Sequence, residues 1–185
     1  VKAGDKSWYT SEYENYNYWT QRVGQSFGAS RMKMSVMRMK AMQVYKTKDV
    51  YGKKLLDQAK EKCILFANEQ KQADALCKHS YHSNNKDSET NMEKFEQGKI
   101  TKLSCVLQLS EGANVVGLKK IILLHAYGNN KKSAQRIGRG LRLNPDDMCE
   151  IDILCFKDSV DEKWVTGALE NFDQNKITWY DTTII

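Results

Sequence analysis

Three arginines spaced by three residues are the part of this sequence best suited to chemistry. Arg136, Arg139 and Arg142 lie on or beside a run of helical character, and their spacing places Arg139 and Arg142 on the same helical face. The planar, permanently charged guanidinium group suits a phosphate ligand. Gly138 and Gly140 stand between the arginines, and two glycines in a helix indicate close approach of another backbone or a ligand. The competing interpretation is an ordinary basic helix end, stabilised by the helix dipole.

The elements that would position these arginines alternate between strands and helices from about residue 62. Short apolar runs predict buried strands at Cys63–Ala67, Leu103–Leu107, Lys120–His125 and Cys149–Phe156. Helical patterns predict helices at Asn68–His79, Ser88–Gln97, Lys132–Arg139 and Asp161–Phe172. Asn68 is the expected N-cap of the first of these helices, and Asp161 that of the last. Ile177–Tyr180 is expected to form a short edge strand. The alternation predicts an α/β layer fold with a mainly parallel sheet, in which ligands lie beyond the carboxyl ends of the strands.

Charge is distributed unevenly along the chain. The formal net charge is +6, and residues 146–185 hold ten acidic residues and three lysines, which gives that tail −7 and leaves +13 on residues 1–145. A basic body favours phosphate-bearing partners through counterion release, and a solvated lysine-rich surface is the alternative. No apolar run approaches the roughly 20 residues that span a bilayer, so we expect a cytoplasmic protein without a membrane partner.

Residues 1–50 have a composition of their own. Aromatic residues crowd the first twenty positions, and the stretch from Asn15 to Lys48 contains seven cations and no acid. Two apolar stripes predict a helix packed on both sides, and they are formed by Met34, Met37, Ala41 and Val44 and by Met32, Val36 and Met39. One interpretation is a nucleic-acid contact, with aromatic rings for base stacking and basic groups for phosphate. The other interpretation, which the pattern favours, is an interdomain linker and packing helix.

The run Gln135-Arg136-Ile137-Gly138-Arg139-Gly140-Leu141-Arg142 is similar to motif VI of superfamily 2 helicases, whose pattern is Gln-Arg-x-Gly-Arg-x-x-Arg. Two weaker motifs precede it in the family's order, because Lys62–Asn68 resembles motif IV and Ser110–Val115 resembles motif V. The resemblance implies the C-terminal, second RecA-like lobe of such a helicase. We therefore expect a three-layer α/β domain with a mainly parallel central sheet over residues 51–185, and a helical N-terminal extension over residues 1–50.

The resemblance also implies roles for the residues of motif VI. Arg139 and Arg142 would be catalytic, as arginine fingers that reach the γ-phosphate of ATP. Arg136 would help to close the two lobes of the helicase around ATP, and Gln135 would lie near the nucleotide.

The other two motifs are implied to contact both ligands. In motif V, Gly112 and Asn114 would contact the nucleotide, and Ser110 and Glu111 would contact the nucleic acid. Asn68, at the end of motif IV, would also contact the nucleic acid. Many relatives carry Asp where Asn114 stands, although the side-chain carbonyl of Asn can still accept a hydrogen bond from a ribose.

The parts that would hold ATP and Mg²⁺ are missing from the sequence. It contains no Gly-x-x-x-x-Gly-Lys-Ser/Thr loop and no Asp-Glu-x-His or Asp-Glu-Ala-Asp run. In the family these belong to the N-terminal RecA-like lobe, which would be the partner of this domain, so we expect the chain alone not to hydrolyse ATP. The Gly-Leu-Arg ending of motif VI is closer to DNA-translocating relatives, so we expect DNA as the nucleic acid.

Two other functions remain as alternatives. One is a non-catalytic nucleic-acid-binding module derived from such a lobe, and the other is a structural α/β domain without salt-dependent affinity for DNA. A metal site is not expected. Cys77, His79 and His82 have no fourth ligand at usual zinc spacing, and a helix end followed by a strand explains them better. The odd number of cysteines, five, does not indicate a disulfide framework.

Overall fold

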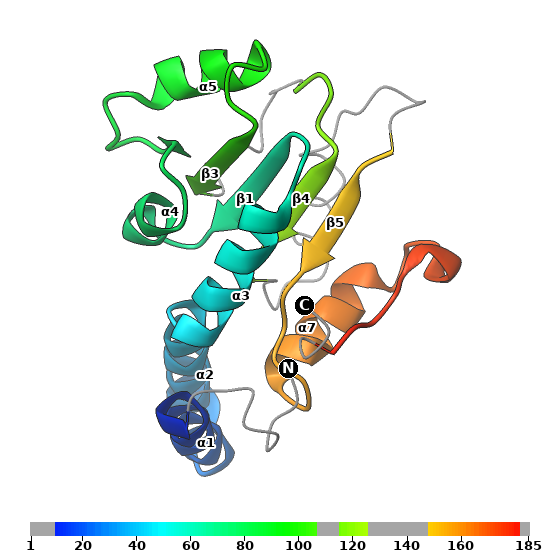
Figure 1. The fold of residues 1–185 in the computed structure, drawn as a ribbon. Coiled ribbons are helices and arrows are strands. Elements are labelled where there is room, and N and C mark those ends of the chain that lie inside the picture. Colours follow the sequence, from blue (N-terminus) through cyan, green and yellow to red (C-terminus); the bar gives the residue numbers. More distant parts are fainter. Residues whose placement is uncertain (1–9, 107–114, 126–147, 182–185) are drawn as a thin grey trace.

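The computed structural model describes residues 10–106, 115–125 and 148–181. Its elements are α1 (Thr10–Gly24), α2 (Gly28–Gln43), α3 (Lys46–Gln58), β1 (Cys63–Ala67), α4 (Gln70–Leu76), β2 (Ser80–Tyr81), α5 (Ser88–Glu96), β3 (Lys102–Val106), β4 (Lys120–Leu123), β5 (Glu150–Ile153), α7 (Val160–Leu169) and the 3₁₀ helix η2 (Gln174–Lys176). Helices flank a central sheet, and a pair of helices extends from one end of it (Figure 1). The prediction of an α/β fold with a parallel sheet is confirmed.

The sheet of the described residues has five strands in the order β2-β3-β1-β4-β5, and every pairing is parallel. The first strand of the chain is therefore the central one. In register, Ala67 of β1 lies opposite Val106 of β3, and Phe66 lies opposite Leu123 of β4. The carboxyl ends of β3, β1 and β4 consequently lie side by side at one edge of the sheet.

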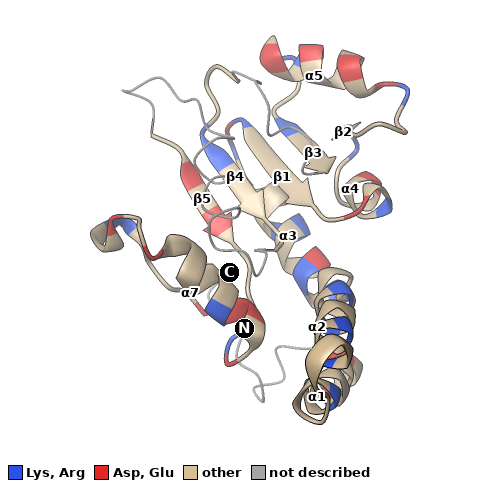
Figure 2. Ribbon diagram, turned by 180° about the vertical axis from the view of Figure 1, so that it is seen from behind, with Lys and Arg blue, Asp and Glu red and all other residues tan. Residues whose placement is uncertain are grey.

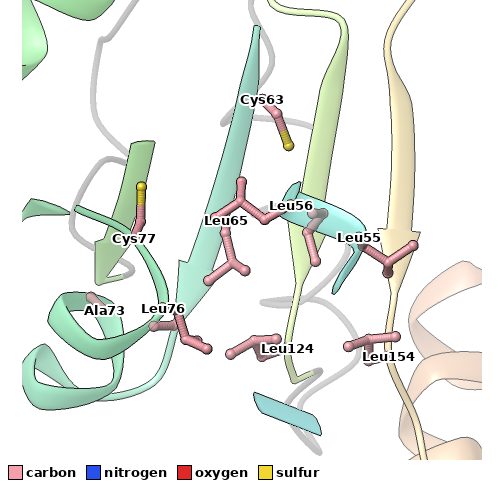
Figure 3. Close-up of a cluster of buried hydrophobic side chains, with 11 residues drawn as sticks. Leu55, Leu56, Cys63, Leu65, Ala73, Leu76, Cys77, Leu124 and Leu154 are labelled. Carbon is pink, nitrogen blue, oxygen red and sulfur yellow. The ribbon is translucent and has the colours of Figure 1, made fainter. Parts of the chain in front are cut away.

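Apolar residues cover both faces of the sheet, which explains why β1 has a continuous apolar sequence. Cys63 and Leu65 pack toward α3 and α4, while the alternate residue Ile64 packs toward α5. Figure 3 shows the first of these two clusters, in which leucines of α3 lie over the strands. Phe95 and Leu103, both with 0% exposure, lie in the second cluster. Two buried faces give the three layers expected of the fold.

A glycine sets how closely α3 approaches the sheet. A Cβ added at Gly52 would lie 2.4 Å from Leu124 Cδ2 and 3.5 Å from Leu65 Cδ1, and both leucines are fully buried. A side chain at this position would therefore require Leu124 to move within the core. Glycine thus lets α3 pack closely against the central strands.

The helices α1 and α2 form an antiparallel hairpin. Glu12 of α1 accepts hydrogen bonds from the Thr47 backbone and hydroxyl, Asn15 accepts one from Tyr45, and Thr20 accepts one from Arg38. These pairs place the start of α1 beside the end of α2. A small third cluster, which includes Tyr16, Met42 and Phe156, joins the hairpin to the C-terminal part of the chain. The turn between α1 and α2 is therefore the end of the hairpin farthest from this cluster.

Some predicted boundaries were wrong. The helix expected to begin at Asn68 begins at Gln70, with Glu69 at its N-cap, and ends at Leu76 instead of His79. The cap of α7 is the hydroxyl of Ser159, not the carboxylate of Asp161. Ile177–Tyr180, expected as an edge strand, follows η2 without strand pairing. The predicted helix Lys132–Arg139 lies outside the described residues.

Other predicted helices and strands agree better with the structure. Helix α5 and the strands β1, β3, β4 and β5 lie within a few residues of their predicted ranges. Helix α3 crosses residue 50, where we placed the boundary between the extension and the lobe. In α2 only Met42 is fully buried, and both predicted apolar stripes contain exposed residues, with Met37 at 39% and Val44 at 46% in the first and Met32 at 72% and Val36 at 40% in the second. None of the described helices is long and apolar enough to cross a membrane.

Candidate nucleotide and nucleic-acid interface

The carboxyl edge of the sheet is the candidate site, because motif IV ends there and the chain leaves it toward the sequences of motifs V and VI. Motif IV ends at Asn68, one residue beyond β1. The segment with motif V continues from Val106, and the segment with motif VI continues from His125, two residues beyond β4. Since β3 and β4 flank β1, the points where these two segments leave the sheet lie roughly 10 Å apart. The two segments therefore leave the sheet on opposite sides of Asn68.

Asn68 is the one predicted site residue that the structure describes. Its backbone N–H donates to Gln72 Oε1 at 2.8 Å, and its Nδ2 donates to the backbone oxygen of Gln43 at 3.2 Å. Gln72 Nε2 donates to the same Gln43 oxygen and, at 2.6 Å, to Asp49. Asn68 therefore links the end of β1 to the last residue of α2 and to α4. Its side chain is half-buried, so it holds this connection at the border of the edge.

The other predicted site residues lie outside the described residues. They are the motif VI residues Gln135, Arg136, Arg139 and Arg142 and the motif V residues Ser110, Glu111, Gly112 and Asn114. The end of motif V, Val115, is described and is buried in the same cluster as Ile64 and Phe95. Lys62 supports the following turn by donating to the backbone oxygens of Val116 and Glu96. The segment with motif V thus returns to a fixed point at the amino edge of the sheet.

A buried charged network, which no sequence pattern predicted, lies at the carboxyl edge. Lys48 Nζ lies 2.5 Å from Asp161 Oδ2 and 3.4 Å from His125 Nδ1. The Lys48 side chain is 4% exposed, and the side chains of Asp161 and His125 are fully buried. Asp161 also accepts the backbone N–H of Phe156 at 3.1 Å. The network joins the first turn of α3, the second residue after β4 and the first turn of α7. It fixes His125, from which the segment with motif VI continues.

The electrostatics of the network favour a neutral imidazole. Burial and the nearby Lys48 ammonium lower the pKa of His125 from its ordinary 6.5 to about 4, against the opposing effect of Asp161. Neutral His125 can accept a hydrogen bond from Lys48 through Nδ1. The edge of the Trp164 ring system lies near the imidazole, with centroids 5.7 Å apart. The only advance signal was Asp161, one of two acids in the first turn of this helix, which the sequence pattern assigned to capping.

The histidines near β2 serve structural roles. His79 Nδ1 lies 3.2 Å from Asn91 Oδ1, and His82 Nε2 lies 2.8 Å from Asp74 Oδ1. Hydrogen bonds from Ser80 and His82 lower the pKa of Asp74. Across the described parts of the chain, no three His, Cys, Asp or Glu side chains gather closely enough to hold a metal ion.

A separate hollow of about 790 Å³ lies beside the edge strand β5. Its walls come mainly from β5, α7 and residues 172–181, including Trp179 and Tyr180. Of the motif residues that the structure describes, Lys62–Asn68 and Val115, none lines it, and the carboxyl edge remains the candidate site.

Comparison with known protein families identifies the family of this chain. Residues 46–144 match the family model described as the helicase conserved C-terminal domain. The chain belongs to this family. The match covers more than half of the sequence, and it begins at the first residue of α3 and includes all three motifs. No curated protein sequence matches the chain.

Solved structures of helicase C-terminal domains share the fold. The chain is similar to the E. coli DEAD-box protein SrmB in its complex with RraA, at 12% identity and a TM-score of 0.53, over 68% of this chain and 79% of that one. It is similar to the C-terminal domain of the DEAD-box protein Dbp5, at 15% identity and a TM-score of 0.54, over 69% and 79%. The C-terminal part of the Fun30 ATPase domain matches at 19% identity and a TM-score of 0.53, over 77% of this chain and 51% of that chain. The described helicase C-terminal domain is thus the second RecA-like lobe of a superfamily 2 helicase.

Proposed function

We propose that this domain is the C-terminal lobe of an ATP-dependent DNA helicase or translocase, and that it supplies Arg139 and Arg142 to ATP held by an N-terminal lobe. The observation that carries the proposal is the topology of the carboxyl edge. The segments with motifs V and VI leave the sheet from β3 and β4, on either side of Asn68. One edge can then present residues to a nucleotide and to a nucleic acid together.

The chemistry follows from the nature of phosphoryl transfer. Negative charge develops on the γ-phosphate oxygens in the transition state, and arginines placed there are worth roughly 10³–10⁵ in rate. The first lobe would supply the phosphate-binding loop and the Mg²⁺ ligands, because this sequence contains neither of their motifs. Gln135, Arg136, Gly112 and Asn114 would contact the nucleotide from this side. The domain alone would not turn over ATP.

The choice of nucleic acid rests on the sequence and is part of the proposal. A related structure is that of S. cerevisiae Dbp5 bound to RNA and ADP BeF3, at 15% identity. It supports a nucleic acid and a nucleotide as the two ligands of the fold. We favour DNA because of the Gly-Leu-Arg ending of motif VI, and we assign its contacts to Ser110, Glu111 and Asn68. A non-catalytic binding module is the alternative, although both candidate fingers are present in the sequence.

The deciding experiment measures ATP hydrolysis by a protein that carries both lobes, with and without DNA or RNA. Arg139→Ala should lower the turnover number at least about 10³-fold while ATP affinity stays nearly unchanged. Lys94→Ala, which removes an exposed cation from α5, is the matched control and should hydrolyse ATP normally. Unchanged turnover in Arg139→Ala would exclude the finger role. Stimulation by RNA and not by DNA would overturn the choice of DNA alone.

A further inference from the structure

The turn between α1 and α2 presents an aromatic ring to solvent. Phe27 is 82% exposed, at the end of the hairpin away from the sheet. Gly28 follows it with a φ of +52°, in the left-handed region that glycine adopts readily, and its Cβ position is open space. Nearby apolar side chains are exposed as well, with Met32 at 72% and Val36 at 40%. The tip therefore carries a set of exposed apolar groups, not one isolated residue.

The cations around this tip are exposed too. Arg22 is in the last turn of α1, and Arg31 and Lys33 are in the first turns of α2. None of the three takes part in an ion pair among the described residues. The sequence from Asn15 to Lys48 holds no acid that could neutralise them. Figure 2 shows such cations along α2, while acids gather on α5, β5 and α7.

Not every cation of the hairpin is available to a ligand. Arg38 donates to Thr20 at 3.2 Å and lies over the Tyr16 ring at 5.9 Å, so it holds α2 against α1. Arg22 lies over the exposed Tyr18 ring at 5.8 Å, and its guanidinium remains at the surface. Arg22 and Arg31 thus differ from Arg38, because within the described parts of the chain their side chains join α1 to α2 by no hydrogen bond or ion pair.

We infer that this turn is a second nucleic-acid contact, in which Phe27 stacks on an unpaired base while Arg22 and Arg31 bind the flanking phosphates. An exposed aromatic ring between arginines is the combination that binds single strands without sequence preference. Excess positive charge fits a polyanion better than it fits an apolar protein surface. The contact lies outside the helicase motifs, on residues that precede the family match at residue 46. It rests on the proposed function, because it takes a nucleic acid as the ligand.

The test uses the 185-residue chain and a fluorescent oligothymidine of about 16 nucleotides, the upper end of common site sizes. Phe27→Ala should weaken binding roughly 5- to 150-fold, the range that loss of one stacked base produces. Phe27→Trp should bind like the unaltered chain, because it keeps a stacking ring. Phe27→Leu should bind as weakly as Phe27→Ala, because it keeps apolar surface without a ring. Full affinity in Phe27→Leu would exclude stacking.

The arginines are tested by salt dependence. Replacing Arg22 and Arg31 together by Ala should lower the slope of log Kd against log salt by about 1.4, since each phosphate contact on a single strand contributes about 0.7. The matched control removes two cations at the far end of the molecule, Lys94 and Lys99 beside α5, and should leave the slope unchanged. Equal effects of the two double variants would reduce the contact to net charge and overturn the inference.

The outcomes separate this inference from the proposed function. Normal binding by Phe27→Ala overturns the second contact and leaves the carboxyl edge untouched. If Phe27→Ala binds normally but slows ATP hydrolysis in the two-lobed protein, the tip contacts the other lobe, and the inference is wrong. If the unaltered chain shows no salt-dependent binding, the inference and the nucleic-acid part of the proposed function both fail, whereas the Arg139 test still stands. Loss of turnover in Arg139→Ala supports the proposed function alone, whereas weakened binding by both Phe27→Ala and Phe27→Leu supports this inference.

Discussion

Two cations from one stretch of sequence, Lys48 and Arg31, have opposite surroundings. Lys48 has a side chain that is 4% exposed and is paired with Asp161, whereas Arg31 is exposed and belongs to none of the ion pairs of the described residues. Both lie in the stretch from Asn15 to Lys48 that has no acid. The acid that pairs with Lys48 comes from the acidic tail. Charge counted along the sequence therefore predicts neither burial nor availability to a ligand.

The two cations are therefore expected to have different roles, one in stability and the other in binding. A buried pair contributes to the position of the residues it joins, and removing one partner leaves a charge without compensation. An exposed arginine contributes little to stability and is available for a phosphate. We therefore expect substitutions at the buried network to act on unfolding, and substitutions at the tip to act on binding.

The largest effect on stability should come from the network. Asp161→Ala leaves Lys48 buried without its carboxylate and is expected to lower the free energy of unfolding by about 3–5 kcal/mol. Urea denaturation followed by circular dichroism measures it. The double variant Lys48→Met and Asp161→Leu should be much less destabilised than the sum of the two single changes, because no unpaired charge remains. Additive effects would show that the two groups do not depend on each other.

Acid should reveal the same network through His125. Its pKa is lowered to about 4 in the folded chain, while the unfolded chain has the ordinary value of 6.5. As pH falls, the unfolded state binds the proton before the folded state does. The stabilisation that comes from keeping His125 neutral is therefore complete above pH 6.5 and is lost between about pH 6.5 and 4. The full loss is about 3 kcal/mol, because each tenfold difference in proton affinity between the two states corresponds to about 1.4 kcal/mol. His125→Gln should show a flatter stability profile over this window, and an unchanged profile would contradict the assignment.

A smaller effect is expected where α3 touches the sheet. Gly52→Val forces side-chain atoms into space filled by Leu124 and Leu65, and overpacking of this kind costs about 1–3 kcal/mol. The matched control is Gly24→Val in α1, because a Cβ there meets nothing within 4 Å and its φ is not in the left-handed region. Thermal unfolding of both variants separates overpacking from the helix preference of valine. Equal losses in the two variants would mean that α3 or Leu124 can shift to accept a side chain.

The smallest effect on stability belongs to the tip. Arg31→Ala and Lys33→Ala should each change the free energy of unfolding by less than about 0.5 kcal/mol, as is usual for exposed positions without structural contacts. Urea titration measures this change beside that of Asp161→Ala. A loss of roughly 2 kcal/mol or more, on the order of a buried interaction, would show that these cations have a packing role and would remove the contrast between the regions.

The sequence predicted the strands better than their surroundings. Apolar runs such as Cys63–Ala67 identify buried strands because both faces of a parallel sheet are covered. Helix ends were less accurate: the cap of α7 is Ser159, two residues before the predicted one, and Asp161 instead pairs with Lys48, a partner that is distant in sequence. The network could not be foreseen for the same reason. A periodic pattern reports which face is apolar, but it does not report which polar groups meet.

Motif recognition supplied the family but not the geometry of the site. Asn68 shows the limit, because its amide bonds to Gln43 at the end of α2, a contact that no motif contains. Likewise, the second apolar stripe of α2 indicated a packed face, whereas the described residues leave Met32 and Val36 exposed. The pattern identified an apolar surface correctly but could not say whether the chain itself covers it.

The long sequence separation of one contact has a consequence for the order of events during synthesis. The Val160 backbone donates to the Tyr16 hydroxyl across 144 residues. Translation at about 5–20 residues per second therefore leaves roughly 7–30 s between the emergence of α1 and that of its C-terminal partner. During this interval α1 and α2 can pair with each other, because their contacts are local in sequence. The side of this hairpin that later packs against Phe156 stays exposed. Closure of this face is then among the last steps of folding.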